Sequence, residues 1–566
     1  MGKCVRRIAA MAVLGMAVSV AVSATPTLLQ NVNGYTLAGD ELQHFSALAF
    51  DQGHVLEVGD VALLRQKYPH ARRIDGRGRT VLPGLIDAHG HVLDLGVQNI
   101  QIQLVGSTSL AEAQQRIRAY VRAHPDSHWL LGGGWNQVLW TLGRFPLARE
   151  LDQAVADRPA ALWRIDGHAA WLNSKALQMA NITRATPDPI GGRIERDADG
   201  NPSGVLVDKA MGLVDRIVPP LSDAERRTAL TAAFAHMNSV GLTGVGDAGC
   251  PGWEIALYRE LADHGRLTVR MYAMIRETGP DFDALSKTGP LIGYGHDRLT
   301  VRAVKLFADG ALGSRGAALL APYSDMPGQR GLLFMSDAEM EQKVEKALRA
   351  GYQVNVHAIG DAANRQVLDA FEHAYAAIGG GRELRNRIEH AQVVSLSDIP
   401  RFKGLDLIAS MQPTHATSDM NMADDRIGPE RLKGAYAWRS FLAQGTRIAG
   451  GSDFPVESDN PFFGLHAAVT RQDHDNRPTG GWHAEQAMTL MEAFRAFTLD
   501  AAYAEHEEKT LGSLEPGKWA DFILIDRDPF KIVPTEIWKI QVEQTWVAGE
   551  KVFGKGAARR SSTDVL

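Results

Sequence analysis

Eight short apolar stretches, most of them separated by helical patterns, run through the sequence between residues 82 and 455. They are LPGLIDAHGHV (82–92), LTGVGDAG (242–249), LTVRMYAMI (267–275), VRAVKLFADG (301–310), YQVNVHAIGD (352–361), RNRIEHAQV (385–393), LDLIASMQPTH (405–415) and TRIAGGSDFP (446–455). Apolar strands that alternate with helices are typical of a parallel sheet. Eight such units are the number in a (β/α)8 barrel. The sequence therefore predicts an α/β protein in which residues 82–505 form a TIM barrel.

Three segments between the later strands carry helix signals. SDAERRTALTAAFAHMNSVG (222–241) begins with a Ser-x-x-Glu capping box and ends at glycine, and SDAEMEQKVEKALRAG (336–351) repeats this arrangement. AANRQVLDAFEHAYAAI (362–378) follows the fifth strand. We expect a helix over each of these ranges.

Two regions do not follow the barrel pattern. Residues 25–81 and 506–566 contain short β-like pieces with glycine-containing turns, and we expect them to pair into one small β-sandwich domain built from both chain ends. The interval between the first and second strands is far longer than a loop. It contains aromatic-rich stretches such as GGGWNQVLW (132–140), so we expect an inserted subdomain at about 125–215.

The first 24 residues have the composition of a secretory signal peptide. Lys3, Arg6 and Arg7 precede the apolar run IAAMAVLGMAVSVAV, and small residues at Val22 and Ala24 suit cleavage after Ala24. The alternative is an uncleaved membrane anchor, but the run is shorter than the roughly 20 residues that a span needs. We therefore expect a periplasmic or secreted protein with no stable membrane insertion after cleavage. Cys250 is then the only cysteine, which excludes an internal disulfide.

The composition excludes some partners. The chain has 566 residues, 22% of them charged, and a net charge of −6, so nothing indicates a nucleic-acid partner. A small-molecule substrate is the expected partner, and a homodimer is one option for the oligomeric state.

Polar residues gather near the carboxyl ends of the predicted strands. His89 and His91 flank Gly90, so in an extended chain both side chains lie on one face and form half of a metal site. Taken alone, the pair is equally consistent with two structural histidines. Further polar residues at the strands of the barrel are Asp247, Lys305, His357, His390, His415 and Asp453. Because active sites of such barrels lie at this end, the set favours a divalent metal, with zinc the default for histidine and aspartate ligands.

Lys305 is the unusual member of this set, because an ammonium group has no lone pair for a metal. Burial lowers the pKa of a lysine, and a neutral amine can capture carbon dioxide as a carbamate, which is a carboxylate ligand. The alternative is a salt bridge to Asp309 or another carboxylate, and the spacing alone favours it.

From about residue 50 to 548 the chain resembles the amidohydrolase superfamily, specifically the YtcJ-like proteins of amidohydrolase family 3. The resemblance is carried by LPGLIDAHGHV, GGGWN, DGHAAWLNS, VKLFADGALGSR, VNVHAIGD, RIEHAQ, MQPTH, GGSDFPVE and GSLEPGKWADFILID. In binuclear members of the superfamily, the His-x-His pair and the eighth-strand aspartate bind one metal. Two further histidines bind a second metal, and a carbamylated lysine bridges the two. The resemblance implies these roles for His89, His91, Asp453, His357, His390 and Lys305, with one or two ions bound.

The resemblance and the site imply hydrolysis by a metal-activated water. A bound divalent metal lowers the pKa of water toward about 7. Asp453 is expected to accept the proton of that water and pass it to the departing nitrogen. The expected reaction is hydrolysis of a non-peptide carbon–nitrogen bond. An ester or lactone substrate, and a regulatory or binding protein on a hydrolase scaffold, are the alternatives.

A second group of residues is expected to contact the substrate. His415 is a candidate to hydrogen-bond the developing oxyanion or the substrate, or is a structural histidine. Arg315 is a candidate to hold an anionic group, or is a solvated loop arginine. Candidates in the insertion, where the alternative is aromatic packing, are Trp135, Asn136, His168, Trp171 and Asn173.

Overall fold

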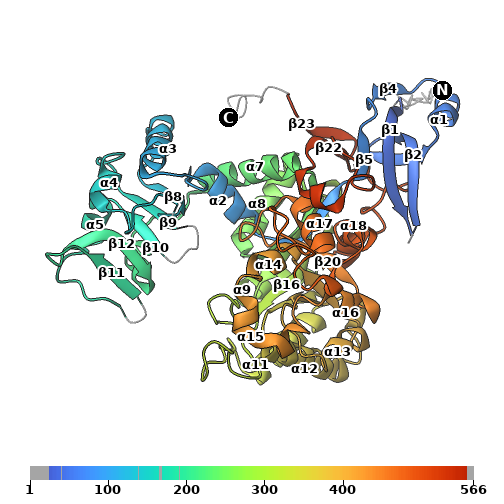
Figure 1. Cartoon of the computed structure of the whole chain (residues 1–566). Coiled ribbons are helices and arrows are strands. Elements are labelled where there is room, and N and C mark those ends of the chain that lie inside the picture. Colours follow the sequence, from blue (N-terminus) through green and yellow to red (C-terminus); the bar gives the residue numbers. More distant parts are fainter. Residues whose placement is uncertain (1–24, 40, 138, 165–168, 190–191, 557–566) are drawn as a thin grey trace, which may run out of the picture.

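The computed structural model describes residues 25–39, 41–137, 139–164, 169–189 and 192–556. The expected signal peptide and the candidate His168 lie outside the described residues. Figure 1 shows a central barrel, a β domain at one side and, at the other side, the insertion, which approaches the barrel at helix α2 (Val92–Ile100). The predicted α/β fold class is confirmed.

The barrel is a near-closed parallel sheet of eight strands, which follow one another in chain order. The strands are β6 (Leu85–Gly90), β13 (Leu242–Cys250), β14 (Arg270–Arg276), β16 (Leu299–Phe307), β17 (Gln353–Ala358), β18 (Arg387–His390), β19 (Ile408–Met411) and β20 (Ile448–Gly450). Each strand overlaps one of the eight predicted stretches. A short strand, β15 (Leu291–Gly293), pairs antiparallel with β16.

Helices surround this sheet. They are α7 (Asp223–Ser239), α8 (Gly252–Asp263), α9 (Pro280–Leu285), α10 (Tyr294–Asp297), α11 (Asp337–Arg349), α12 (Asp361–Ile378), α13 (Ile399–Gly404), α14 (Pro413–Asp419), α15 (Ala423–Leu432), α16 (Trp438–Ala443), α17 (Pro461–Thr470), α18 (Leu490–Ala496) and α19 (Leu499–Ala504). The three helices predicted from capping and periodicity are α7, α11 and α12. The Ser222 side chain accepts the N–H of Glu225 and completes the expected capping box of α7.

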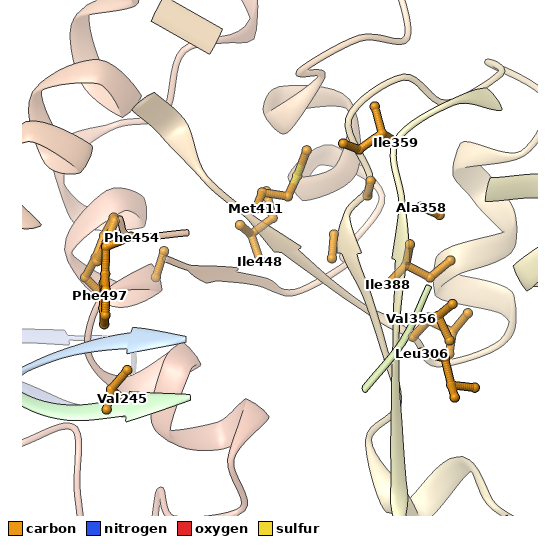
Figure 2. Close-up of a cluster of buried hydrophobic side chains, with 14 of the residues drawn as sticks. Val245, Leu306, Val356, Ala358, Ile359, Ile388, Met411, Ile448, Phe454 and Phe497 are labelled. Carbon is orange, nitrogen blue, oxygen red and sulfur yellow. The ribbon is translucent and has the colours of Figure 1, made fainter. Parts of the chain in front are cut away.

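Alternation along the strands separates an apolar layer from a polar interior. Leu306, Val356 and Ile388 occupy register positions side by side on β16, β17 and β18, and all three are fully buried (Figure 2). Because neighbouring residues of a strand point to opposite faces, the next residues in each strand face the barrel interior. Apolar packing against the helices thus fixes the strands that carry the polar interior groups.

The first and last strands meet at a seam that closes just beyond β20. The Asp453 N–H donates to the carbonyl of His89 at 2.7 Å, and the His91 N–H donates to the carbonyl of Phe454 at 2.8 Å. The Ser452 hydroxyl donates to Asp87 at 2.6 Å. The residues that close the barrel are therefore also members or neighbours of the predicted metal site.

The insertion is a separate six-stranded sheet with its own core. Its elements are β7 (Ile102–Gln103), α3 (Leu110–Ala123), β8 (Leu130–Trp135), α4 (Ala148–Asp152), β9 (Ala160–Arg164), β10 (Ala169–Leu172), α5 (Ser174–Met179), β11 (Gly192–Arg196), β12 (Pro202–Asp208) and α6 (Gly212–Asp215). It starts before the expected boundary near 125, because α3 packs Ala113 and Ile117 into the same core as β8.

The two chain ends form one mixed sheet of eight strands. The strands are β1 (Thr27–Ala38), β2 (Glu41–Asp51), β3 (His54–Gly59), β4 (Arg72–Asp75), β5 (Thr80–Pro83), β21 (Phe522–Ile525), β22 (Val542–Val547) and β23 (Glu550–Gly554), with helix α1 (Val61–Lys67) after β3. The two ends join where β21 pairs antiparallel with β5. Within the described residues, no helix has the length and apolarity needed to cross a membrane.

Candidate metal centre

The structure brings together all six residues predicted as metal ligands at the carboxyl end of the barrel. His89 lies in β6, one position before its end, and His91 directly precedes α2. Lys305, His357 and His390 lie on β16, β17 and β18. Asp453 follows β20. The six groups thus come from five strands of the barrel.

Three of these groups form a compact set of metal donors. Asp453 Oδ1 lies 3.0 Å from His91 Nε2 and 3.4 Å from His89 Nε2. The donor atoms of all three side chains lie within 4.8 Å of one another. This spacing suits one ion that replaces the direct contacts between the ligands.

A second set of donors shares Asp453. The donor atoms of His390, His415 and Asp453 also lie within 4.8 Å of one another. The ring of His357 lies 4.6 Å from that of His390. His357 Nε2 and His415 Nε2 are buried and make no hydrogen bond. Each has only a longer contact with a carboxylate, to Asp309 Oδ1 at 3.4 Å and to Asp453 Oδ2 at 3.6 Å. Because buried polar atoms are nearly always satisfied, these nitrogens fit the coordination of a bound cation.

Unusual backbone angles aim two of the ligands. His390 has φ +73° and Asp453 has φ +61°, in the left-handed region that non-glycine residues rarely adopt. Regular alternation would place Glu389 and His390 on opposite faces of β18. The positive φ ends the strand at His390 and allows both side chains to serve the same site.

The protonation states suit metal binding. Burial and the neighbouring Lys305 lower the pKa of His89 to about 4, and burial and His357 hold the pKa of His390 well below its ordinary value. Burial alone would raise the pKa of Asp453, but the hydrogen bond from His91 and the surrounding histidines hold it well below the usual range. At neutral pH His89 and His390 are therefore neutral and Asp453 is ionised. At His91, burial lowers the pKa, but the hydrogen bond to Asp453 outweighs it and the pKa is raised.

Lys305 is buried among these ligands. Its Nζ lies 3.3 Å from His89 Nε2, and burial lowers its pKa to about 8 even though Glu389 and Asp453 oppose the shift. The alternative salt bridge to Asp309 is not formed in the described structure. The Asp309 carboxylate instead accepts the backbone N–H groups of Ala318, Ile359 and Gly360.

Sequence reasoning missed the residues that orient the ligands. Glu389 is fully buried and accepts the Nδ1–H of His89 at 2.6 Å, which leaves Nε2 of His89 directed at the site. Arg387 lies 3.0 Å from the other carboxylate oxygen of Glu389. Gln412 accepts the Nδ1–H of His390 at 2.8 Å. Glu389 stands next to His390 in the motif RIEH, and its charge inside an apolar strand was the signal that could have found it.

His415 lies beside the site, as expected for a residue that assists catalysis. Its Nε2 is 3.6 Å from Asp453 Oδ2. The surrounding side chains, among them His390, Gln392, Tyr436 and Trp438, leave almost no open space beside it.

The aromatic candidates of the insertion lie in its own core. Trp135 and Trp171 are fully buried and pack against Trp140. The Trp135 indole donates to the carbonyl of Leu162 at 2.7 Å. Asn173 is fully buried and caps α5. The expectation that Trp135 contacts substrate is therefore corrected, because packing satisfies both its ring and its N–H group.

Two further polar candidates have other partners. Arg315 forms a two-point ion pair with Asp325, at 2.8 and 3.2 Å, so its guanidinium is already neutralised. Asp247 accepts the Val92 N–H at 3.0 Å and the Tyr258 hydroxyl at 2.6 Å. Arg315 therefore has a structural role in a barrel loop, and Asp247 has one within strand β13.

Together, the barrel and the histidine–aspartate centre define a metal-dependent hydrolase. The model of the amidohydrolase family (Amidohydro_3) matches residues 72–553. The chain belongs to this family, in agreement with the resemblance seen in its motifs.

Similar proteins span nearly the whole chain. YtcJ of Bacillus subtilis (strain 168) is 33% identical over 533 residues, which are 92% of this chain and 98% of that protein. The N-substituted formamide deformylase of Arthrobacter pascens is 28% identical and covers 89% of this chain and 94% of its own. A solved structure of a metal-dependent hydrolase from Pyrococcus horikoshii OT3 is 28% identical, covers 90% of this chain and 99% of its own, and has a TM-score of 0.74.

Proposed function

We propose that this protein hydrolyses a non-peptide carbon–nitrogen bond, of the amide type, in a small molecule. The observation that carries the proposal is the convergence of four histidines, Lys305 and Asp453 at the carboxyl end of the barrel. The similarity to a deformylase of N-substituted formamides supports an amide-type bond.

Zinc is the proposed metal, because imidazole nitrogens and a carboxylate match its preference. His89, His91 and Asp453 would hold the first ion. A second ion would lie near His357 and His390, with Lys305 between the two as a carbamate. When bound, such an ion lowers the pKa of a water molecule and polarises the substrate carbonyl.

Asp453 is the proposed proton carrier. Its low pKa keeps it ionised at neutral pH, so it can accept a proton from the attacking water. The same carboxyl group then donates that proton to the leaving nitrogen. His415, whose Nε2 faces Asp453 Oδ2, is placed to donate a hydrogen bond to the substrate oxygen.

Metal analysis combined with a substrate panel tests this function. Purified protein is assayed with N-formyl and N-acetyl amines and with matched esters and lactones. Cleavage of amides that is lost on chelation and restored by zinc supports the proposal. Faster cleavage of the esters or lactones assigns that alternative, and a metal-free protein with no activity in the panel favours a regulatory or binding role.

Export is a further proposal, which rests on residues 1–24. The basic, apolar and small-residue segments of this stretch support cleavage after Ala24. Sequencing of the native protein from periplasm or medium should then begin at Thr25. A soluble native protein that still carries Met1 contradicts the proposal.

A further inference from the structure

Arg276 ends the third barrel strand, β14, at the same end of the barrel as the metal ligands. In the parallel ladder of β14 and β16, Arg276 is the register partner of Lys305. Register partners on neighbouring strands point to the same face of a sheet. The register therefore directs the Arg276 side chain toward the mouth of the barrel, beside the buried lysine.

One end of this side chain is fixed and the other is free. Arg276 Nε donates to the carbonyl of Gly249, at the end of β13, at 2.7 Å. The residue is exposed, and in the part of the chain that the structure describes neither terminal nitrogen has an ion-pair or hydrogen-bond partner. A guanidinium presents its donors as a planar fork that matches a carboxylate. Its stem is thus held in place while the fork remains available.

Arg276, Lys305 and Phe307 line one small space. A Cβ atom added at Gly249 would lie 3.7 Å from Arg276 Nε, 3.7 Å from Lys305 Cγ and 3.9 Å from Phe307 Cζ. Gly249 has φ +101°, so a side chain is disfavoured there on backbone grounds as well. The half-buried ring of Phe307 lies 5.9 Å from that of His357. An apolar surface thus runs from the arginine toward the metal ligands.

Two comparisons support a ligand-binding role for this arginine. Arg315, the arginine that the sequence offered as an anion-binding residue, is already paired with Asp325. The nearby carboxylate Asp94 lies within the electrostatic influence of both His91 and Arg276, yet it forms no ion pair with Arg276 among the described residues. A fixed cation with free donors at the mouth is suited to an anion that arrives with the substrate.

We propose that Arg276 binds a carboxylate of the substrate, while Phe307 packs against an apolar group between this carboxylate and the scissile bond. The inference rests on the proposed amide hydrolysis and narrows its substrates to amides that carry an anionic group.

Two formamides that differ by one carboxylate test the inference. Metal-loaded protein is assayed with N-formylphenylalanine and with N-formyl-2-phenylethylamine. We expect Arg276→Gln to lower kcat/KM for the anionic substrate about 10- to 100-fold, the usual effect of losing a charged hydrogen bond. The kcat/KM for the neutral substrate and the metal content of the protein should stay at their wild-type values. Arg276→Lys should recover part of the loss, since it keeps the charge without the fork.

Arg266→Gln is the matched control, because Arg266 is an exposed arginine just before β14, at the opposite end of the barrel. It should behave as wild type with both substrates. An equal loss of activity toward the two formamides in Arg276→Gln overturns the inference and leaves Arg276 with a structural role at the end of β14.

Binding gives a readout that does not depend on hydrolysis. Calorimetry compares 3-phenylpropanoate with the neutral 3-phenylpropanamide in wild type and Arg276→Gln. Weaker binding of 3-phenylpropanoate to the variant, in a protein that cleaves no formamide, refutes the proposed reaction and retains the anion site. Equal binding of 3-phenylpropanoate to both proteins refutes the anion site.

Discussion

The barrel mouth and the insertion each bring together ring-bearing side chains that the sequence offered as site candidates, yet the structure uses them differently. At the mouth, the ring of His390 on β18 meets that of His357 on the neighbouring strand β17 and that of His89, which lies far away in the sequence on β6. In the insertion, Trp135 and Trp171 pack against each other within one apolar core. The topology of a parallel barrel delivers the residues at strand ends to one place, whereas aromatic residues in a sheet domain pack first of all with their neighbours. Position in the topology is thus a better guide to a site than residue type.

Removal of a metal ligand should have the largest effect on the mouth. His89→Ala and His357→Ala are each expected to lower bound metal and abolish hydrolysis, because fewer donors hold the ion weakly. Metal stoichiometry and turnover are measured side by side. His373→Ala, an exposed histidine paired with Glu341, is the control and should retain both. Full metal occupancy and activity in both ligand variants would show that these histidines are not metal ligands.

Asp453→Asn should separate proton transfer from metal binding. An amide oxygen can still touch the metal, but it cannot accept a proton at neutral pH. Much of the metal should remain while turnover falls by about 10²- to 10⁴-fold. Lys305→Ala should instead lower the metal content, with partial rescue by a short carboxylic acid. An active Asp453→Asn protein would show that Asp453 is not the proton carrier, and His415 would be the next candidate for that role.

Trp135→Ala should act on stability rather than on the site. Loss of a large buried aromatic side chain typically costs about 3–5 kcal/mol. Urea unfolding should show the insertion destabilised, while the folded protein keeps its metal. A variant of normal stability with a raised KM would contradict this prediction. It would show that Trp135 contacts the substrate, so that the insertion takes part in the site.

Glu389→Gln should weaken the metal without removing it. A lost hydrogen bond to a ligating histidine typically lowers metal affinity about 10- to 100-fold. Competition with a chelating dye measures this affinity. Glu254→Gln is the matched control, because burial raises the pKa of Glu254 to about 8 and its side chain is already neutral at pH 7. Equal affinities in the two variants would reduce Glu389 to a partner of Arg387.

Glu389→Gln should also change the pH dependence of stability in the metal-free protein. Burial would raise the pKa of Glu389, but Arg387 and His89 lower it to about 2. A lowered folded-state pKa contributes stability above the unfolded value, near 4.5, and this contribution is lost as the pH falls toward about 2. The difference in Tm between wild type and Glu389→Gln should therefore shrink below pH 4.5.

The smallest effect is expected at Arg315. Its guanidinium is bound by Asp325 in a surface loop, so Arg315→Gln should change kcat/KM by no more than about twofold, in line with the small contribution of exposed ion pairs. Steady-state kinetics with an anionic and a neutral amide check this. A loss confined to the anionic amide would give Arg315 the role inferred for Arg276.

The strand pattern was enough to predict the barrel and the approach of its polar strand ends. It could not predict that Glu389 and His390 serve one site, because alternation along β18 places these neighbours on opposite faces until the positive φ of His390 is known. Arg276 was missed for a simpler reason: the predicted third strand stopped at residue 275, one position before it. The sequence also could not show that Trp135 lies in the core of the insertion, because it does not reveal which neighbours pack against the ring and accept its N–H group. Local backbone strain and side-chain packing are thus what the pattern leaves out.

Because the metal site includes residues at the seam between β6 and β20, the complete site can form only late in the synthesis of the chain. His91 and Asp453 meet across a separation of 362 residues. A nascent chain that has not yet reached Asp453 therefore lacks both the shared carboxylate and the backbone contacts that close the barrel. Complete metal loading is thus an event of the finished chain, and a prematurely terminated product cannot assemble the full ligand set.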